Sequence, residues 1–353
     1  MKVDDRDVFD LTGPNHLCNK SLCSDNKRAL IGALVQAVYV SEVDRHQRRL
    51  GPCALAPKWW AELGYELVRF LREDEESEPI VGAIYRRLAG REAFSEADRN
   101  ELPTVVVAFR GTMLRHEEPL RYDMTANLNV FLNHLHATRR FFTALETIRS
   151  SVNEVGLENI TIAGHSLGAS IALLAGQTLA YEGIFVDTHL FSPPFPSPPI
   201  ERIKHRKVKL ALNLTGVACA TGLSHLLLDK GKMETSFRQF FSLRAWCPHL
   251  YVNPLDPICS SYISYFNTHE FMQRIGASSF AHMTAPVSLR GTLQQFFLND
   301  CKPFHLVPCA ILHVVNKRCA KLVRAHGLHQ WWWPDIEVDY QKMSVIAGDM
   351  MSD

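Results

Sequence analysis

The sequence predicts an α/β fold in which a mainly parallel central sheet is flanked by helices. Strand-like and helix-like stretches alternate along most of the 353 residues, which favours parallel strands joined by helical crossovers. The run TVVVAF at 104–109 is apolar on both faces, as expected of a strand inside a parallel sheet. A chain of this length can bury one large core, and we expect a single domain over residues 1–353.

The N-terminal segment 1–75 is expected to be mainly helical. Apolar side chains recur at helical spacing over 27–48. A second helix is predicted over 57–71, because Pro57 stands in what would be its first turn. The next segment, 79–88, has the pattern of a strand and leads toward the apolar run described above.

The rest of the chain continues the alternation. We expect helices over 135–154, 167–179 and 220–243, and strands over 159–163, 184–191, 247–253 and 309–315. The strand at 309–315 is expected to be the last of the sheet, while 255–305 has no pattern clear enough to assign.

Composition and charge exclude several function classes. The chain is 46% hydrophobic and 21% charged, and its net charge of +1 gives no support for binding to nucleic acid. It contains no apolar run of the ~20 residues that span a bilayer, and its charged beginning does not resemble a secretory signal. Nine cysteines without a CxxC pair indicate neither a zinc site nor a disulfide framework. We therefore expect a protein of the reducing cytoplasm.

The stretch TIAGHSLGASIALLAG at 161–176 carries the clearest chemical signal. It contains Gly164-His165-Ser166-Leu167-Gly168, with a strand-like run before it and a helix-like run after it. A serine in a sharp strand-to-helix turn needs small neighbours, because the backbone segments approach closely there. The sequence therefore predicts a nucleophile elbow with Ser166 as the nucleophile.

A nucleophilic serine needs an acid and a base, and the acid should lie at the carboxyl end of a strand. Asp256 follows the predicted strand 247–253 within NPLDP, where two prolines stiffen the turn. Asp187 is the main competitor but lies within its predicted strand, and Asp300 follows no strand end that can be defined. We expect Asp256 to be the acid, although an aspartate beside proline is also a common turn residue.

The base should follow the last predicted strand, since the chain order in such hydrolases is serine, acid, histidine. His326 and His329 both do, within AHGLHQWWW, whereas His305 precedes the strand and His313 lies inside it. Spacing alone does not choose between His326 and His329. Either could instead be a histidine packed beside the tryptophans.

An oxyanion hole needs two backbone amides. The first is expected from Leu167, the residue after the nucleophile. The second should come from a loop after an earlier strand, and VVVAFRGT ends with Gly111 and Thr112, which allow a close approach to substrate. Arg110-Gly111 could equally be an ordinary strand exit.

Together, VVAFRGT and GHSLGAS resemble the class 3 lipase branch of the α/β-hydrolases. More closely, the chain resembles plant α/β-hydrolases that are often labelled GDSL esterase/lipase-like, although its serine lies in an elbow. The stretches that carry this resemblance are FDLTGP, GPCALAPKWW, FSPPFPSPPIERIK, NPLDPICSSYISYF and AHGLHQWW. They begin at residue 9 and are spread over nearly the whole chain, whereas Ala169 departs from the family's usual second glycine.

The resemblance implies an α/β-hydrolase fold, with Ser166 as nucleophile and the amides of Thr112 and Leu167 as oxyanion donors. HGLHQW fits the family's histidine stretch with His326 at its head, which favours His326 over His329. The separation of Ser166 from Asp256 is long for this family and implies an insertion around 195–243. Residues 113–130 stand where related lipases carry a lid.

The expected activity is hydrolysis of a carboxylic ester, either a small ester or an acyl lipid, through an acyl-enzyme. A thioesterase or acyltransferase is an alternative, as is an α/β-hydrolase fold that only binds a ligand or partner. Neither metal nor organic cofactor is expected, because the chain has no HExxH and no glycine-rich dinucleotide fingerprint. Transient contact with a membrane and the oligomeric state stay open.

Overall fold

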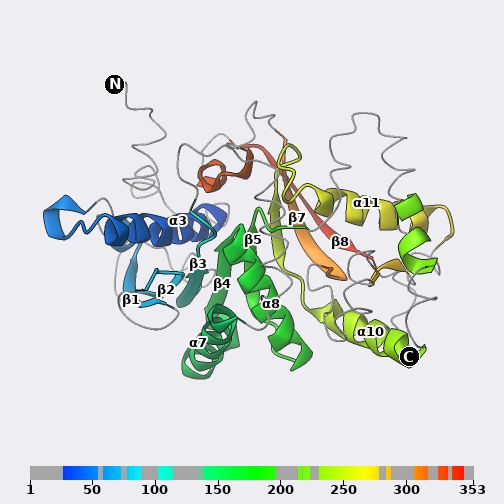
Figure 1. The fold of residues 1–353 in the computed structure, drawn as a ribbon, viewed down its shortest axis with the longest axis horizontal. Coiled ribbons are helices and arrows are strands. Elements are labelled where there is room, and N and C mark those ends of the chain that lie inside the picture. The colour runs from blue at the N-terminus through cyan, green and yellow to red at the C-terminus, as the bar shows by residue number, and fades with distance from the viewer. Residues whose placement is uncertain are drawn as a thin grey trace.

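The computed structural model describes residues 27–54, 59–72, 78–88, 102–113, 135, 138–195, 214–216, 218–222, 230–277, 284–287, 306–316, 325–332 and 336–345. These residues form one eight-stranded sheet with helices packed on it (Figure 1). None of the helices within these ranges is both long enough and apolar enough to cross a bilayer.

The strands of the sheet lie side by side in chain order. They are β1 (Tyr65–Leu71), β2 (Gly82–Arg87), β3 (Val105–Phe109), β4 (Ile160–His165), β5 (Asp187–Phe191), β6 (His249–Val252), β7 (Cys309–Val315) and β8 (Val338–Ser344). The strands from β3 to β7 are parallel, whereas β1, β2 and β8 pair antiparallel with their neighbours. The predicted α/β fold with a mainly parallel sheet is confirmed.

The two faces of the sheet are covered by different parts of the chain. On one face pack α7 (Arg139–Val155), α8 (Leu167–Tyr181), α10 (Lys230–Ser242) and α11 (Ser261–Arg274). These four helices belong to connections between successive parallel strands, which right-handed crossovers place on the same face. The other face is covered by α3 (Lys27–His46) together with the short helix η7 (Leu328–Trp332) (Figure 1).

The alternation of side chains in β3 shows how both cores form. Val105, Val107 and Phe109 enter the core under α7 and α8, while Val106 and Ala108 enter the core under α3. All five are buried, and burial of one valine side chain contributes roughly 1.5–3 kcal/mol. The apolar run at 104–109 is therefore a strand that is buried on both faces.

The predicted helix over 57–71 is wrong beyond residue 62. The helix α4 (Trp59–Glu62) is only one turn long, and Gly64 then adopts φ +79°, which a residue with a side chain rarely does. Residues Tyr65–Leu71 form β1 and pair antiparallel with β2. The apolar residues of this segment fit the two-residue repeat of a strand as well as the 3.6-residue repeat of a helix. Pairing with β2 selects the strand. Segment 1–75 is therefore not uniformly helical.

The boundaries predicted for the strand at 309–315 are confirmed as β7, but this strand is not the last. β8 follows it and pairs with its whole length. Most β8 side chains are exposed, so the strand lacks the apolar pattern of a buried one. Charged residues on such an edge strand also discourage pairing with other chains.

Several other predictions match elements of the structure. The helices at 135–154 and 167–179 correspond to α7 and α8, the later part of the helix predicted at 220–243 is observed as α10, and the unassigned segment contains α11. Residues 196–213, 223–229 and 114–130 lie outside the described ranges. The insertion, the lid and the single domain therefore stay predictions.

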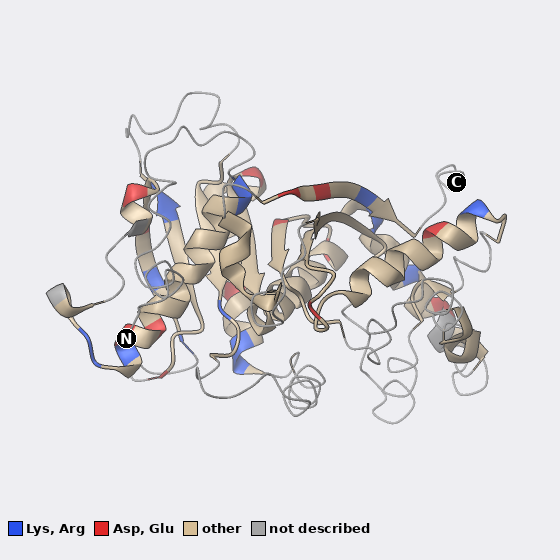
Figure 2. Cartoon of the chain, turned by 90° about the horizontal axis from the view of Figure 1, so that it is seen from above, with Lys and Arg blue, Asp and Glu red and all other residues tan. Residues whose placement is uncertain are grey.

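Charged side chains of both signs are distributed over the described elements. Figure 2 shows Lys and Arg interspersed with Asp and Glu on helices and strands alike, as the net charge of +1 leads one to expect.

Candidate functional site

Ser166 stands at the carboxyl end of β4, between the strand and α8. Its φ of +54° and ψ of −123° are rarely adopted by a residue with a side chain. The amide of Ser166 donates to the carbonyl of Phe191 at the end of β5, 3.0 Å away, which holds the turn against the next strand. This strained strand-to-helix turn has the geometry of a nucleophile elbow.

The glycines on either side of Ser166 allow the backbone segments to touch. A Cβ on Gly164 would lie 2.2 Å from the carbonyl oxygen of Gly168. A Cβ on Gly168 would lie 2.4 Å from the carbonyl oxygen of Phe109, at the end of β3. No side chain fits at either position, which is the physical reason for the spacing of the motif.

The loop after β3 runs directly beside Ser166. A Cβ on Gly111 would lie 2.8 Å from the Cβ of Ser166. Arg110 fixes this loop from within, since its Nε donates to the carbonyl of Ile80 at 2.6 Å and its Nη1 to the carbonyl of Gly111 at 2.7 Å. Thr112 follows and is exposed. These hydrogen bonds and the close approach of Gly111 hold the segment beside Ser166.

Tyr39 and His165 link this loop to the elbow. His165 Nε2 lies 2.8 Å from the carbonyl oxygen of His326, and its Nδ1 lies 2.8 Å from the Tyr39 hydroxyl. Because a carbonyl can only accept, Nε2 carries the proton and Nδ1 accepts the tyrosine O–H. The Tyr39 oxygen in turn accepts the N–H of Gly111 at 2.7 Å. Burial, followed by the neighbouring His326, lowers the pKa of His165 to about 3, so this ring is neutral.

Asp256 and His326, both selected from the sequence, meet in the structure. Asp256 lies in the turn after β6, is fully buried, and accepts His326 Nδ1–H on Oδ2 at 2.8 Å. The amide of Ile258 and the thiol of Cys259 each donate to the same carboxylate at 3.0 Å. Burial alone would raise the pKa of Asp256, but the neighbouring His326 and these hydrogen bonds hold it below its usual value. An ionised Asp256 thus keeps the His326 proton on Nδ1 and leaves Nε2 able to accept another.

Asn253 and Gln330 clamp the two segments that carry this pair. Asn253 Nδ2 donates to Gln330 Oε1 at 2.8 Å, and its own Oδ1 accepts the amide of Leu255. Gln330 Nε2 donates to the carbonyls of Ala325 and Gly327, both at 2.8 Å, on either side of His326. The sequence alone did not identify Asn253, Gln330, Cys259 or Tyr39 as residues of this site. Asn253 at a strand end was the one visible signal among them.

The competing histidines occupy other positions. His329 lies in η7 and is half-buried, whereas the hydrogen bond to Asp256 comes from His326. His313 lies within β7, where its Nε2 is 2.9 Å from Nδ1 of His249. His305 and the competing acid Asp300 lie outside the described residues.

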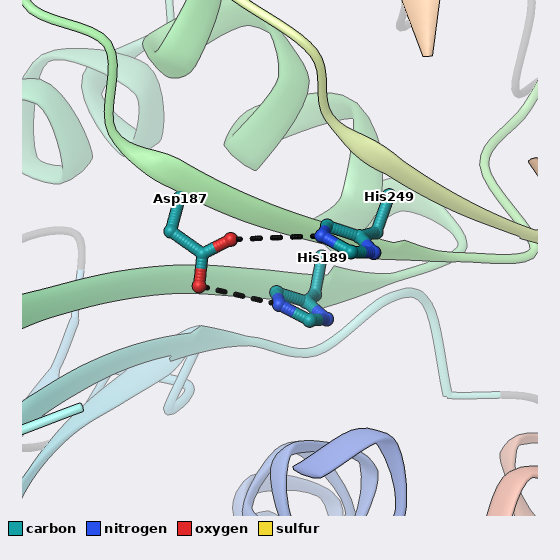
Figure 3. A group of neighbouring side chains, drawn as sticks. All are labelled: Asp187, His189 and His249. Atoms are coloured by element: carbon teal, nitrogen blue, oxygen red, sulfur yellow. Dashed lines mark hydrogen bonds and ion pairs between the residues drawn. The ribbon is translucent and has the colours of Figure 1, made fainter. Parts of the chain in front are cut away.

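Asp187, the other competing acid, is the first residue of β5 rather than a residue in the middle of the strand. It therefore lies at the opposite end of the sheet from Ser166. Its carboxylate faces His189 Nε2 at 3.3 Å and His249 Nε2 at 3.9 Å (Figure 3). It also accepts Lys27 Nζ at 3.0 Å and the Thr161 hydroxyl at 2.7 Å. Asp187 thus ties α3 to three strands.

Asp187, His189 and His249 also have ligand-type atoms within 4.8 Å of one another, as a metal site would require. Two features favour a hydrogen-bonded cluster over a metal centre. The ammonium of Lys27 already neutralises the carboxylate, and the His189 and His249 rings stack with 3° between their planes. A metal ion lies near the plane of each imidazole that binds it, so two stacked rings are poorly placed to share one ion.

Comparison with known proteins agrees with this geometry. The sequence pattern of the family described as Lipase (class 3) matches residues 106–198, a range that contains both the Gly111 loop and the elbow. A protein of Arabidopsis thaliana named as a GDSL esterase/lipase is 36% identical over 345 residues, covering 95% of this chain and 97% of that protein. No solved structure matches the chain.

The family pattern covers the segments from β3 to the end of β5, and the identity to the Arabidopsis protein extends over nearly the whole chain. Both similarities agree with the resemblance that the FRGT and GHSLG motifs suggested. The mainly parallel sheet with a serine elbow after its central strand is the architecture that such a relationship requires. The chain therefore belongs to a class 3 lipase-like plant family of carboxylic ester hydrolases.

Proposed function

We propose that the protein hydrolyses carboxylic esters through an acyl-enzyme on Ser166, with His326 as the base and Asp256 as the acid. The observation that carries this proposal is the buried His326–Asp256 hydrogen bond of 2.8 Å next to a strained serine turn. A serine hydroxyl is a weak nucleophile until a neutral imidazole takes its proton. A buried carboxylate stabilises the imidazolium that results.

Acylation would begin when Ser166 Oγ attacks the ester carbonyl carbon while His326 Nε2 takes the hydroxyl proton. The negative charge then develops on the carbonyl oxygen, where the amides of Leu167 and Thr112 would donate to it. Leu167 is the first residue of α8, and amides in a first helical turn have no partner within the helix. Collapse of the tetrahedral intermediate expels the alcohol, which takes the proton back from His326.

Deacylation would follow the same path with water in place of serine. His326 removes a proton from water, the resulting hydroxide attacks the acyl carbonyl, and the acid product leaves as Ser166 recovers its proton. The neutral His165 beside His326 adds no positive charge that would oppose formation of the imidazolium. Asp256 stays ionised throughout, since its pKa is held below the usual value.

The substrate class that we propose is a small ester or an acyl lipid inside the cell. The described cysteines 53, 219, 247, 259 and 309 are free thiols, which suits the cytoplasm. The stretch MLRHEEPLRYDM after the oxyanion loop is rich in charge and would adsorb poorly to lipid. We therefore favour esterase activity with at most transient membrane contact.

Hydrolysis of p-nitrophenyl esters from acetate to palmitate by the wild type and by Ser166→Ala tests this proposal. We expect turnover by the wild type and a loss of at least about 10³-fold in Ser166→Ala, because the nucleophile is removed. A parallel series of acyl thioesters, with and without an alcohol acceptor, separates thioesterase and acyltransferase activity. A folded wild type that turns over none of these compounds would favour a binding protein instead.

A further inference from the structure

Cys247 and Cys309 form a pair of thiols away from the serine site. Cys247 lies just before β6, Cys309 is the first residue of β7, and their sulfur atoms are 2.8 Å apart. The two strands are held in register beside them by the hydrogen bond from the Ile311 amide to the Pro248 carbonyl, at 2.9 Å. The pairing of the strands thus fixes the two thiols against each other.

The surroundings of the pair favour oxidation chemistry. Cys247 is half-buried, while Cys309 is 5% exposed, so a small reagent reaches the pair from one side. The hydrogen bond from Cys247 and the ammonium of Lys342 on β8 lower the pKa of Cys309. The reactive form of cysteine is the thiolate, and the closeness of Cys309 raises the pKa of Cys247 instead. The two sulfurs therefore have unequal roles.

The structure assigns Cys247 and Cys309 as a thiol pair that a peroxide converts to a disulfide between β6 and β7. The Cys309 thiolate attacks one peroxide oxygen, the O–O bond breaks, and a sulfenic acid forms on Cys309. The Cys247 sulfur then attacks the Cys309 sulfur, and the oxygen leaves as water. In total, two thiols and one hydrogen peroxide give one disulfide and two waters.

The position of this bond gives it a structural consequence. It would close a loop of 62 residues and fix the beginnings of two neighbouring strands. β6 leads at its other end to Asp256, and β7 precedes the segment that carries His326. We expect the oxidised protein to melt about 3–10 °C higher than the reduced protein, because a cross-link of this length restricts the unfolded chain.

Peptide mapping without reduction tests the assignment on the full chain. After treatment with hydrogen peroxide and alkylation, we expect a linked peptide that joins Cys247 to Cys309. In Cys247→Ser the link should be absent, and dimedone should label Cys309 as a sulfenic acid. Cys219→Ser is the matched control, because this exposed cysteine should leave the link unchanged.

The exposed Cys53 and Cys219 report within the same sample whether the oxidant has acted. Recovery of Cys247 and Cys309 as separate alkylated thiols, while Cys53 or Cys219 is oxidised, would overturn the assignment. So would a link from either residue to a different cysteine. The test does not depend on the protein's enzymatic activity.

A second inference follows from the hydrogen bonds of Tyr39 and rests on the proposed function. We infer that Tyr39 and His165 are positioning residues that hold the oxyanion loop and the base in one arrangement. The N–H of Gly111 donates to the Tyr39 oxygen, and the Tyr39 hydroxyl donates to Nδ1 of His165. Nε2 of His165 donates in turn to the carbonyl of His326. Each hydrogen bond in this series has one possible donor and one possible acceptor.

We expect this series of hydrogen bonds to affect kcat more than KM. Tyr39→Phe removes both the acceptor of the Gly111 amide and the donor to His165 while keeping the ring. We expect kcat to fall about 10–100-fold with KM within about threefold, because misplaced oxyanion amides mainly weaken transition-state binding. Labelling of Ser166 by a fluorophosphonate should slow by a similar factor.

Tyr65→Phe is the matched control. Tyr65 is fully buried, and its hydroxyl donates to the Pro103 carbonyl at 2.8 Å, near the other end of β3. Tyr65→Phe loses one buried hydrogen bond, and Tyr39→Phe loses two partly buried ones. A purely structural role therefore predicts a lower melting temperature in both variants, with similar kcat values. Only the positioning role predicts a lower kcat in Tyr39→Phe alone.

The outcomes separate this inference from the proposed function. Suppose that Ser166 of the wild type reacts with the fluorophosphonate. If Tyr39→Phe then reacts with the probe and turns over ester as fast as Tyr65→Phe does, only the positioning role is overturned. If wild-type Ser166 does not react at all, the proposed function fails and the positioning role fails with it.

Discussion

Ser166, Arg48 and Ser192 are the non-glycine residues with positive φ among those described. Ser166 is the proposed nucleophile, and Ser192 contacts the backbone of the proposed base. Ser192 has φ +46°, and its hydroxyl donates to the carbonyl of His326 at 3.2 Å, the same oxygen that His165 reaches. Unfavourable backbone conformations of this kind cost about 1–3 kcal/mol each and persist where the surrounding structure enforces them. Their occurrence at Ser166 and at a residue bonded to His326 supports a site that is held in a strained arrangement.

The choice between His326 and His329 leads to a direct prediction. His326→Ala removes the imidazole that bonds to Asp256, so we expect ester turnover to fall by about 10³-fold or more. His329→Ala should retain turnover within about tenfold. Steady-state kinetics of both variants, with melting temperatures as a control for folding, makes the comparison. An active His326→Ala beside an inactive His329→Ala would reverse the assignment.

At the level of elements, the loop after β3 and the elbow function as one packed unit. A Cβ on Gly111 would lie 2.7 Å from the Tyr39 hydroxyl and 2.8 Å from both the His165 carbonyl and the Ser166 Cβ. These neighbours are backbone or buried atoms, so the loop itself would have to move. The loop can therefore change only together with the serine turn.

Gly111→Val is accordingly expected to reduce kcat by about 10²–10³-fold, as loss of one oxyanion donor does. Gly222→Ala is the control, because a Cβ at Gly222 has no heavy atom within 4 Å. Thr112→Ser should be nearly silent, since the proposed donor is the backbone amide. Full activity in Gly111→Val, measured on the same ester, would show that this loop does not form the oxyanion hole.

How far the sequence predicts each element depends on where the relevant interactions lie. The elbow is predictable because its constraints are local, namely two glycines within two residues of Ser166. β1 and β8 lack a clear strand pattern of their own, and pairing with the neighbouring strands β2 and β7 determines their conformation. Tyr39 looks like any other helical position, and its hydrogen bond to His165 spans 126 residues. Tertiary packing alone shows its connection to the site.

For the whole molecule, buried histidines predict how stability depends on pH. Burial lowers the pKa of His269 to about 4. It lowers the pKa of three other histidines to about 3, namely His165, His249 and His313. In the unfolded chain these histidines have pKa values near the ordinary 6.5. Between about pH 3 and pH 6.5, the unfolded chain therefore binds more protons than the folded chain. Stability is therefore full above about pH 6.5 and declines as the pH falls toward 3.

Each such histidine adds a slope of up to about 1.4 kcal/mol per pH unit in this range. We expect the free energy of unfolding to be at least about 2 kcal/mol lower at pH 5 than at pH 7.5. Urea unfolding at the two pH values measures the difference. Equal or greater stability at pH 5 would mean that these histidines become protonated within the folded protein.

The central claim is that Ser166 is an activated nucleophile, and covalent labelling with a fluorophosphonate probe measures this without knowledge of the substrate. At pH 7.5 we expect the probe to modify the wild type at a single serine, which peptide mapping identifies as Ser166. Ser166→Ala should remain folded and unlabelled, and His326→Ala should label at least about 10²-fold more slowly, because the base is missing. A folded wild type that stays unlabelled, or is labelled equally well in Ser166→Ala, would contradict the account.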